Sequence, residues 1–305
     1  MKKILLTCTD LMAIQFFTEH IKFWHENNYH IDLVCSAVGG RVSELIDFFG
    51  EIENGSIRTV ALSRSPFKIS NLKGFLQLMR IAKKDYYDIV VTNEPVMGLL
   101  TRLAFANKRE TKVTYIAHGF HFYRGGSKLN NLIYKTIEGF AAHFTDSLVT
   151  INKEDFEAAK EFGLKKNGTI RYIPGIGVNT SKFYKSSKEE CAQIREELGL
   201  TVDDFVVAVI GELNDNKNQE TIIRAIAALK SECPELKALF MGKGEQAEYL
   251  KKLCSELNVN DMVHFLGYRH DVNRILSVCD LGASASFREG LGLNVIEEMA
   301  AGLPV

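Results

Sequence analysis

Apolar, strand-like runs alternate with helical patterns along the whole chain, and this alternation is the strongest constraint on its fold. Runs such as Lys3–Thr7 and Asp88–Thr92 have the composition of buried strands, and amphipathic segments such as Asn71–Lys84 separate them. Parallel strands need a crossover connection, which is usually a helix. The order therefore predicts an α/β protein built from doubly wound, Rossmann-like parallel sheets with helices on their faces.

The expected elements fall into two series. The first series has strands at 3–7, 30–36, 57–62, 88–92, 112–118, 147–152 and 169–173, and helices at 16–27, 43–49, 71–84, 97–106, 129–144 and 153–162. The second has strands at 205–210, 238–241, 263–266 and 281–283, and helices at 192–198, 219–229, 245–257, 272–277 and 292–300. The polar stretch Pro174–Lys188, with Gly175 and Gly177, is the best linker candidate between them. A chain of 305 residues suits two such domains, for which we expect the bounds 1–180 and 181–305.

Composition excludes several classes of protein. The formal net charge is −1, so no overall positive field attracts nucleic acid. The N-terminus MKKILLTCTD predicts a first strand rather than a signal peptide, and no apolar run is long enough to span a bilayer. The six cysteines are scattered, which is typical of reduced thiols in a cytoplasmic protein. No loop carries Asp-x-Asp, so we expect neither a metal site nor a bound cofactor.

The last stretch of the chain, ASASFREGLGLNVIEEMAAGLPV from Ala283, predicts a loop and then a helix. Glu289 lies in the loop and Glu297 lies about two turns into the helix, so their carboxylates can address opposite ends of one extended polar ligand. Gly290 and Gly292 allow the backbone to approach that ligand, and free N–H groups at a helix start suit a pyrophosphate. Two glutamates on a solvated helix face are the alternative interpretation.

With its flanks SFREG and EEMAAGLPV, this stretch resembles the glutamate-seven-residues-glutamate motif of retaining GT-B glycosyltransferases, which include bacterial capsule and exopolysaccharide enzymes. The resemblance covers nearly the whole chain. It implies two Rossmann-like domains facing across a cleft and hinged at the linker. The first domain would bind the acceptor and the second the nucleotide sugar. Family members continue beyond the LPV, so we expect the second domain to be incomplete.

The resemblance also implies the donor site. Glu289 would hold hydroxyls of the donor sugar and face its anomeric carbon, Glu297 would bind the ribose hydroxyls, and the intervening Gly290, Leu291 and Gly292 would contact the donor. In GELNDNKN, Lys217 would neutralise the diphosphate beside Gly211. Glu212 stands where the family commonly has an arginine. A solvated loop lysine is the alternative for Lys217.

One further stretch of the second series resembles a donor-binding segment of the family. In HFLGYRHDV, Tyr268 and Arg269 would contact the nucleobase, although Tyr268 suits an ordinary surface position equally well. Gly242 and Gly244 predict a tight turn at the end of the preceding strand. Asn218 is a candidate N-cap for the helix that follows Lys217.

In the first series, YIAHGFHFYRGG places His118 at the end of a buried strand. The family has a histidine there, close to the transferred sugar, and HGFHFY resembles the branch that extends lipid-linked oligosaccharides. His121, Asn93 and Glu94 are candidate acceptor contacts. A structural histidine is the alternative for His118. The loop from Thr7 to Ala13 departs from the family, because it lacks the glycines that many members carry there.

Residues 64–84 contain six basic side chains and no acidic one, interleaved with apolar residues. A basic amphipathic helix of this kind can lie on an anionic membrane surface and bring the site to a lipid-linked acceptor. The alternative is a helix that packs on the sheet with a basic outer face.

These features predict a retaining, metal-independent glycosyltransferase on the inner face of the cell membrane. It would move a sugar from a nucleotide diphosphate sugar, for which we favour a UDP-sugar, to a lipid-linked or saccharide acceptor in cell-surface polysaccharide synthesis. Alternatives are a nucleotide-sugar-binding module without turnover and a UDP-sugar 2-epimerase, although the resemblance argues against the epimerase. A nicotinamide dehydrogenase is disfavoured, because no G-x-G-x-x-G follows a first strand.

Overall fold

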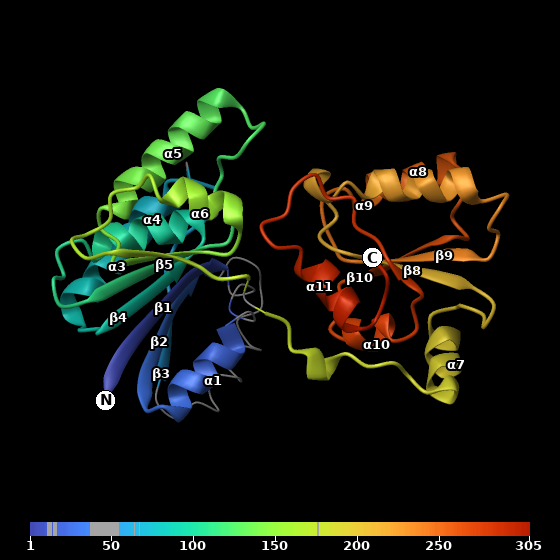
Figure 1. Ribbon diagram of the computed structural model, residues 1–305, viewed down its shortest axis with the longest axis horizontal. Helices are drawn as coiled ribbons and strands as arrows, with labels where there is room; N and C mark the ends of the chain where they lie inside the picture. The colour runs from blue at the N-terminus through green and yellow to red at the C-terminus, as the bar shows by residue number, and fades with distance from the viewer. Residues whose placement is uncertain (11–13, 15–16, 37–54, 64, 67, 176) are drawn as a thin grey trace. The chain divides into compact units, whose positions relative to one another are not determined.

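The structure is a computed structural model that describes residues 1–305 except 11–13, 15–16, 37–54, 64, 67 and 176. The chain divides into two compact units, Met1–Ile176 and Gly177–Val305, which are described separately (Figure 1). The expected helix at 43–49 lies outside the described residues. Within the described residues, no helix has both the length and the apolar character needed to cross a bilayer.

The first unit contains a seven-stranded parallel sheet in the order β3-β2-β1-β4-β5-β6-β7. Its strands are β1 (Lys2–Asp10), β2 (Tyr29–Ser36), β3 (Gly55–Thr59), β4 (Ile89–Asn93), β5 (Lys112–Ala117), β6 (Ser147–Thr150) and β7 (Thr169–Tyr172). Its helices are α1 (Thr18–Glu26), α3 (Ser70–Lys84), α4 (Pro95–Ala104), α5 (Lys128–Ala142) and α6 (Lys153–Ala159).

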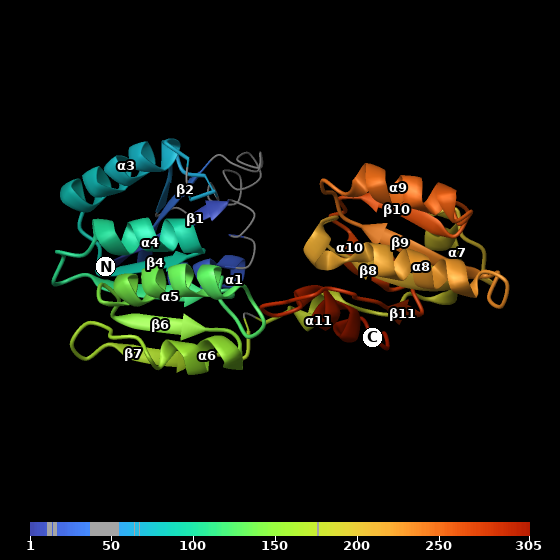
Figure 2. The same ribbon diagram turned by 90° about the horizontal axis from the view of Figure 1, so that it is seen from above.

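Alternation along β1 divides this unit into two core layers. Ile4 and Leu6 pack with Ile21 of α1 on one face of the sheet, whereas Leu5 packs with Leu78 of α3 and Met97 of α4 on the other. Helices α3, α4, α5 and α6 cover that second face side by side, as Figure 2 shows. Because β1, β4 and β5 are neighbouring parallel strands, their polar carboxyl ends lie at the same edge of the sheet.

The second unit contains a four-stranded parallel sheet in the order β10-β9-β8-β11. Its strands are β8 (Phe205–Ile210), β9 (Leu236–Met241), β10 (Val263–Gly267) and β11 (Leu281–Gly282). Its helices are α7 (Lys188–Glu197), α8 (Gln219–Leu229), α9 (Ala247–Glu256), α10 (Val272–Leu276) and α11 (Leu293–Ala300), with short 3₁₀ turns η2 (Thr180–Lys182) and η3 (Asp215–Lys217).

Some element bounds differ from the expectation. Helix α7 begins at Lys188 rather than Ala192, because the hydroxyl of Ser187 accepts the backbone N–H of Glu190 and caps the helix. Strand β3 ends at Thr59, although the strand was expected to reach Leu62. The Val60 N–H still donates to the Cys35 carbonyl, but the Leu62 N–H turns back to the Val60 carbonyl.

Candidate active site

The loops that follow β8 and β9 pack backbone against backbone. A Cβ atom on Gly242 would lie 1.9 Å from the Gly211 carbonyl oxygen, and one on Gly244 would lie 2.1 Å from the Leu213 carbonyl oxygen. The Leu213 N–H also donates to the Lys243 carbonyl over 3.1 Å. Glycine at 242 and 244 therefore allows the two loops to approach each other closely. The turn expected at Gly242–Gly244 thus has a structural role in packing these loops.

The Lys217 side chain extends from the end of η3 to the loop before α11. Its aliphatic chain packs on Gly211, where a Cβ would lie 3.1 Å from the lysine Cε. Its Nζ lies 2.6 Å from Oε1 of Glu289, and the two side chains are only 19% and 30% exposed. The structure therefore places Gly211, Lys217 and Glu289 together, which the alternative of a solvated loop lysine does not account for.

Asparagine side chains tie the same two loops together. Asn216 Nδ2 donates to the Arg288 carbonyl over 2.8 Å, and its own backbone carbonyl accepts the Phe287 N–H. Asn218 lies at the N-cap of α8, as expected, but it has a left-handed backbone and its side chain makes no cap hydrogen bond. Its Nδ2 donates to the Ala285 carbonyl instead, over 3.2 Å. Loop 284–289 is thus held by the η3 turn, a role for Asn216 that no sequence pattern suggested.

Helix α11 carries two carboxyl groups in unusual surroundings. Burial raises the pKa of Glu297 above its ordinary value. Its neighbour Glu298 is fully buried, and neither of its carboxyl oxygens has a hydrogen-bond partner among the described residues. Burial, reinforced by the charge of Glu297 and opposed by that of Lys217, raises the pKa of Glu298 to about 8. Sequence reasoning missed Glu298, because a second glutamate in EEM looks like part of a solvated face.

Glu298 fits beneath β11 because position 282 is a glycine. A Cβ on Gly282 would lie 2.5 Å from Oε2 of Glu298. The nearby amides of Asn294 and Gln219 are also buried, and each has one side-chain atom without a partner among the described residues. A narrow hollow of about 10 Å³ next to Lys217 and Gln219 reaches the loop at 283–286. The second unit therefore holds several buried polar atoms that the described residues leave unsatisfied.

The predicted nucleobase residues have internal partners. Arg269 Nε and Nη2 donate to the two oxygens of Asp271 over 2.8 and 2.6 Å. The Tyr268 ring lies edge-on to His270, with centroids 5.2 Å apart. Both residues follow Gly267, at the end of β10 and so at the same sheet edge as Gly211. A contact of Tyr268 with a base stays a prediction.

In the first unit, His118 follows the last residue of β5. Its ring lies edge-on to the Phe17 ring, with centroids 6.1 Å apart. Its buried Nε2 has no hydrogen-bond partner among the described residues. Burial lowers the pKa of the imidazole, so the neutral form is favoured. A neutral histidine with an unused ring nitrogen can exchange a hydrogen bond with a hydroxyl-rich ligand.

The end of β4, which pairs with β5, and the end of β1, the strand beyond β4, also have unsatisfied polar atoms. Asn93 is fully buried, with its amide donating to the Thr7 carbonyl over 3.0 Å and its Oδ1 unpartnered within the described residues. The buried Thr9 hydroxyl has no partner there either, and the Thr9 N–H donates to Glu94. Glu94 has a left-handed backbone, with φ 66°. Buried polar atoms are ordinarily satisfied, so this edge suits a polar ligand, and Thr9 is a member that the sequence analysis did not single out.

Side chains in the loop after His118 alternate between buried and exposed positions. Phe120 and Phe122 are buried and stacked with centroids 4.8 Å apart, whereas His121 is exposed beside Tyr134. The Phe120 N–H donates to the buried carboxylate of Asp155 over 2.9 Å. This anchor fixes the loop that carries both histidines, and an acceptor contact of His121 stays a prediction.

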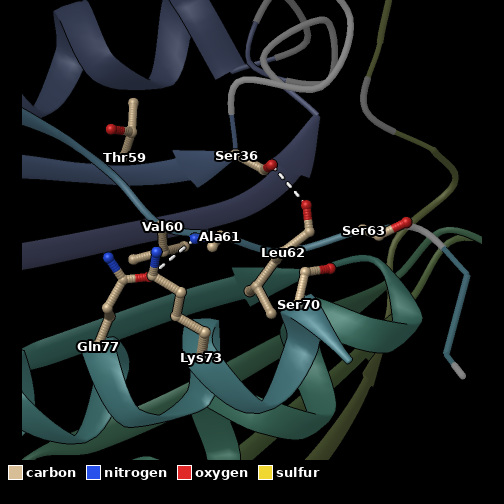
Figure 3. Close-up of a pocket in the computed structure, with 9 residues that line it drawn as sticks. All are labelled: Ser36, Thr59, Val60, Ala61, Leu62, Ser63, Ser70, Lys73 and Gln77. Atoms are coloured by element: carbon tan, nitrogen blue, oxygen red, sulfur yellow. Dashed lines mark hydrogen bonds between the residues drawn. The ribbon is translucent and has the colours of Figure 1, made fainter. Parts of the chain in front are cut away.

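A separate hollow in the first unit lies away from these residues. It has a volume of about 530 Å³ and lies between the end of β2, the segment 59–63 and the first turns of α3 (Figure 3). Two of its polar groups are used internally, since Ser36 Oγ donates to the Leu62 carbonyl and Gln77 Oε1 accepts the Ala61 N–H. None of the predicted site residues lines it, so we do not assign it to the site.

Comparison with known proteins identifies the class. A family model described as Glycosyl transferases group 1 matches residues 191–305, and one described as Glycosyl transferase 4-like matches residues 5–152. The structure of Anabaena HepE in complex with UDP and glucose superposes with a TM-score of 0.78 at 21% identity, covering 100% of this chain and 80% of that one. The fold is therefore the GT-B fold that the sequence predicted.

Curated relatives agree with the family models. The putative glycosyltransferase EpsD of Bacillus subtilis is 41% identical over 249 residues, which are 81% of this chain and 65% of EpsD. The UDP-Gal:alpha-D-GlcNAc-diphosphoundecaprenol alpha-1,3-galactosyltransferase of Escherichia coli is 29% identical over 283 residues, 90% of this chain and 70% of that enzyme. Both halves of the chain thus match glycosyl transferase families, the 4-like family over residues 5–152 and group 1 over residues 191–305, and the chain spans slightly less than two thirds of EpsD.

Proposed function

We propose that this chain is a retaining glycosyltransferase that uses a UDP-sugar as donor. The observation that carries the proposal is the pairing of Lys217 and Glu289, at 2.6 Å, beside the close-packed glycine loops at the ends of β8 and β9. The pair supports the proposal because an ammonium group suits a diphosphate and an adjacent carboxylate suits the hydroxyls of a sugar. The UDP and glucose in the HepE complex support the nucleotide.

The chemistry follows from charge. As the bond between the anomeric carbon and the diphosphate breaks, negative charge grows on the leaving group, and Lys217 with nearby backbone N–H groups stabilises it. Glu289 faces the electron-poor anomeric carbon, and Glu297 holds the ribose. The acceptor hydroxyl forms the new bond from the leaving-group side, and its proton passes to the departing phosphate. In this scheme no metal or cofactor takes part, and His118 contacts the transferred sugar.

For the acceptor we propose a lipid-linked saccharide in cell-surface polysaccharide synthesis. The galactosyltransferase of E. coli that is similar to this chain acts, by its name, on a diphosphoundecaprenol-linked sugar. The basic segment 64–84 supports placement at the inner face of the cell membrane. Helix α3 buries Leu78 and Ile81 on the sheet and exposes Lys73, Arg80 and Met79, so it packs on the sheet and also presents a basic face.

Calorimetric titration with UDP, GDP and ADP tests the donor site. We expect micromolar binding of UDP, with Lys217→Ala and Glu297→Ala each weakening it about tenfold or more, because each removes a charged partner of the ligand. Lys251→Ala removes an exposed lysine of α9 and is the matched control. Unchanged binding in both site variants would refute the donor site.

Transfer from UDP-sugars to a lipid-linked acceptor then separates the two candidate functions. A module that only binds nucleotide sugars would titrate normally and release no UDP with any acceptor. The predicted transferase releases UDP and keeps the anomeric configuration, which NMR of the product reports.

A further inference from the structure

Helix α5 has an apolar stripe that the described residues of its unit leave exposed. Leu129, Leu132, Ile133, Ile137 and Phe140 are 65%, 66%, 46%, 37% and 54% exposed. They are spaced by three and four residues, so they lie on one side of the helix. Isolated exposed apolar residues are ordinary, but five in one row are an interaction surface.

The stripe is not the side that packs on the domain. The opposite side of α5 buries Glu138, Ala141 and Ala142. Glu138 accepts from Arg102 Nη2 of α4 over 2.8 Å, and Arg102 lies over the Tyr115 ring at 3.9 Å. This buried ion pair fixes the rotation of α5, so the stripe faces outward in the folded unit.

Helix α3 carries a second apolar row on the same face of the sheet. The row consists of exposed apolar residues: Ile69 at the N-cap of the helix, and Leu72, Leu76 and Met79 within it. Helix α4 packs between α3 and α5, and all three cover one face of the seven-stranded sheet (Figure 2). The two rows therefore belong to one outer surface, which we call the helical face.

Charge indicates what covers the helical face. Helices α3, α4 and α5 contain one acidic residue, Glu138, and it is buried. Their cations include the exposed Lys73, Arg80 and Lys83 of α3 and Lys128 of α5. The whole chain has a net charge of −1, so this positive region is local. The adjacent α6, by contrast, mixes exposed acids such as Glu157 with lysines.

We infer that the helical face docks on an anionic lipid bilayer, with the α5 stripe entering the headgroup–acyl boundary and the cations of α3 and α5 holding anionic headgroups. Apolar rows flanked by lysines and arginines, without exposed acids, are what such a surface needs. A second copy of the chain would place like charges opposite each other, which opposes pairing of two helical faces. The inference stands on surface chemistry and does not depend on sugar transfer.

Vesicle flotation tests the inference on the 305-residue chain. We expect it to float with vesicles of phosphatidylglycerol and phosphatidylcholine, and to remain unbound with pure phosphatidylcholine. Leu132→Ser with Ile133→Ser should lower the partition coefficient about tenfold or more, because two large apolar side chains no longer leave water. Lys73→Gln with Arg80→Gln should lower it severalfold and reduce its salt dependence.

Val202→Ser with Leu229→Ser is the matched control, because it removes two exposed apolar side chains from the second unit. It should float like the parent chain. Circular dichroism and a thermal melt report whether each variant remains folded, independently of nucleotide binding. Parent chain that stays unbound, or a Leu132→Ser/Ile133→Ser variant that floats like the parent, would overturn the inference. So would a parent dimer in light scattering that this variant converts to a monomer, since the stripe would then pair two chains.

Discussion

Lys217 Nζ lies 2.6 Å from Glu289 Oε1, and this ion pair joins two residues 72 positions apart in the sequence. A diphosphate must therefore compete with Glu289 for the ammonium group. We predict that Glu289→Gln binds UDP at least as tightly as the parent chain, because it releases Lys217, while sugar transfer falls about a hundredfold or more. Calorimetry with UDP and a UDP-release assay measure the two quantities.

Lys217→Met supplies the contrast, since it should weaken UDP binding and transfer together. If Glu289→Gln weakens UDP binding as much as Lys217→Met does, the carboxylate is part of the nucleotide site and the competition does not exist.

Substitutions at Gly242 and Gly292 distinguish a glycine required by the packing of the fold from one that we expect the ligand to require. A Cβ on Gly242 would lie 1.9 Å from the Gly211 carbonyl oxygen, so Gly242→Ala should push the loops apart and lower the free energy of unfolding by several kcal/mol. A Cβ on Gly292 would lie 3.5 Å from its nearest neighbour, and φ is −62°, so alanine fits the fold at this position. Gly292→Ala should leave the urea midpoint unchanged and weaken UDP binding. Full UDP affinity in this variant would show that the ligand does not approach position 292.

Glu298 should make the stability of the chain depend on pH. Its carboxyl group has a pKa raised by burial to about 8, against 4.5 in the unfolded chain. Between these values the folded state keeps a proton that the unfolded state has lost, so stability falls as pH rises from about 4.5 to about 8. Glu298→Gln should remove this loss and be more stable than the parent by a few kcal/mol at pH 8, with the difference shrinking towards pH 4.5.

Urea denaturation across this pH range measures the effect. Glu248→Gln, on the exposed surface of α9, is the matched control and should not change the profile. A Glu298→Gln variant whose advantage is constant with pH would show that the carboxyl group is ionised in the folded chain.

The buried pair of Arg102 and Glu138 should be costly to break from one side. Arg102→Met leaves Glu138 without its 2.8 Å partner in a site where both side chains are less than 10% exposed. The expected loss is about 3–5 kcal/mol of unfolding free energy. Arg102→Met combined with Glu138→Leu should recover most of it, and a double-mutant cycle in urea gives the coupling. Additive effects of the two substitutions would mean that the pair contributes little.

Much of this architecture is predictable from sequence because it depends on patterns that repeat. Alternating strands and helices indicated both parallel sheets, and the C-terminal motif with its flanks identified the family. The hydrogen bonds that set helix ends were harder to predict from the sequence. The early start of α7 depends on one serine cap, and the left-handed Asn218 gives up its cap bond to hold Ala285. Such choices between competing hydrogen bonds are decided by tertiary contacts.

The candidate site shows the same division. Glu289 and Lys217 were predictable as candidates for one donor site because each lies in a motif, but the ion pair between them was not. Glu298 and Asn216 were not, since a buried glutamate and a loop asparagine have no sequence signature. Thr9 was also missed, because its importance comes from neighbouring strand ends at Asn93 and His118, which are far apart along the chain.

The close approach of Gly242 to the carbonyl of Gly211 also has a consequence for the construction of chimaeras. The loops after β8 and β9 fit each other through main-chain atoms, so each is shaped by the other rather than by its own residues alone. A chimaera that takes one of these loops from a relative would inherit only half of a matched surface. Exchange of the two loops as a single cassette preserves the match.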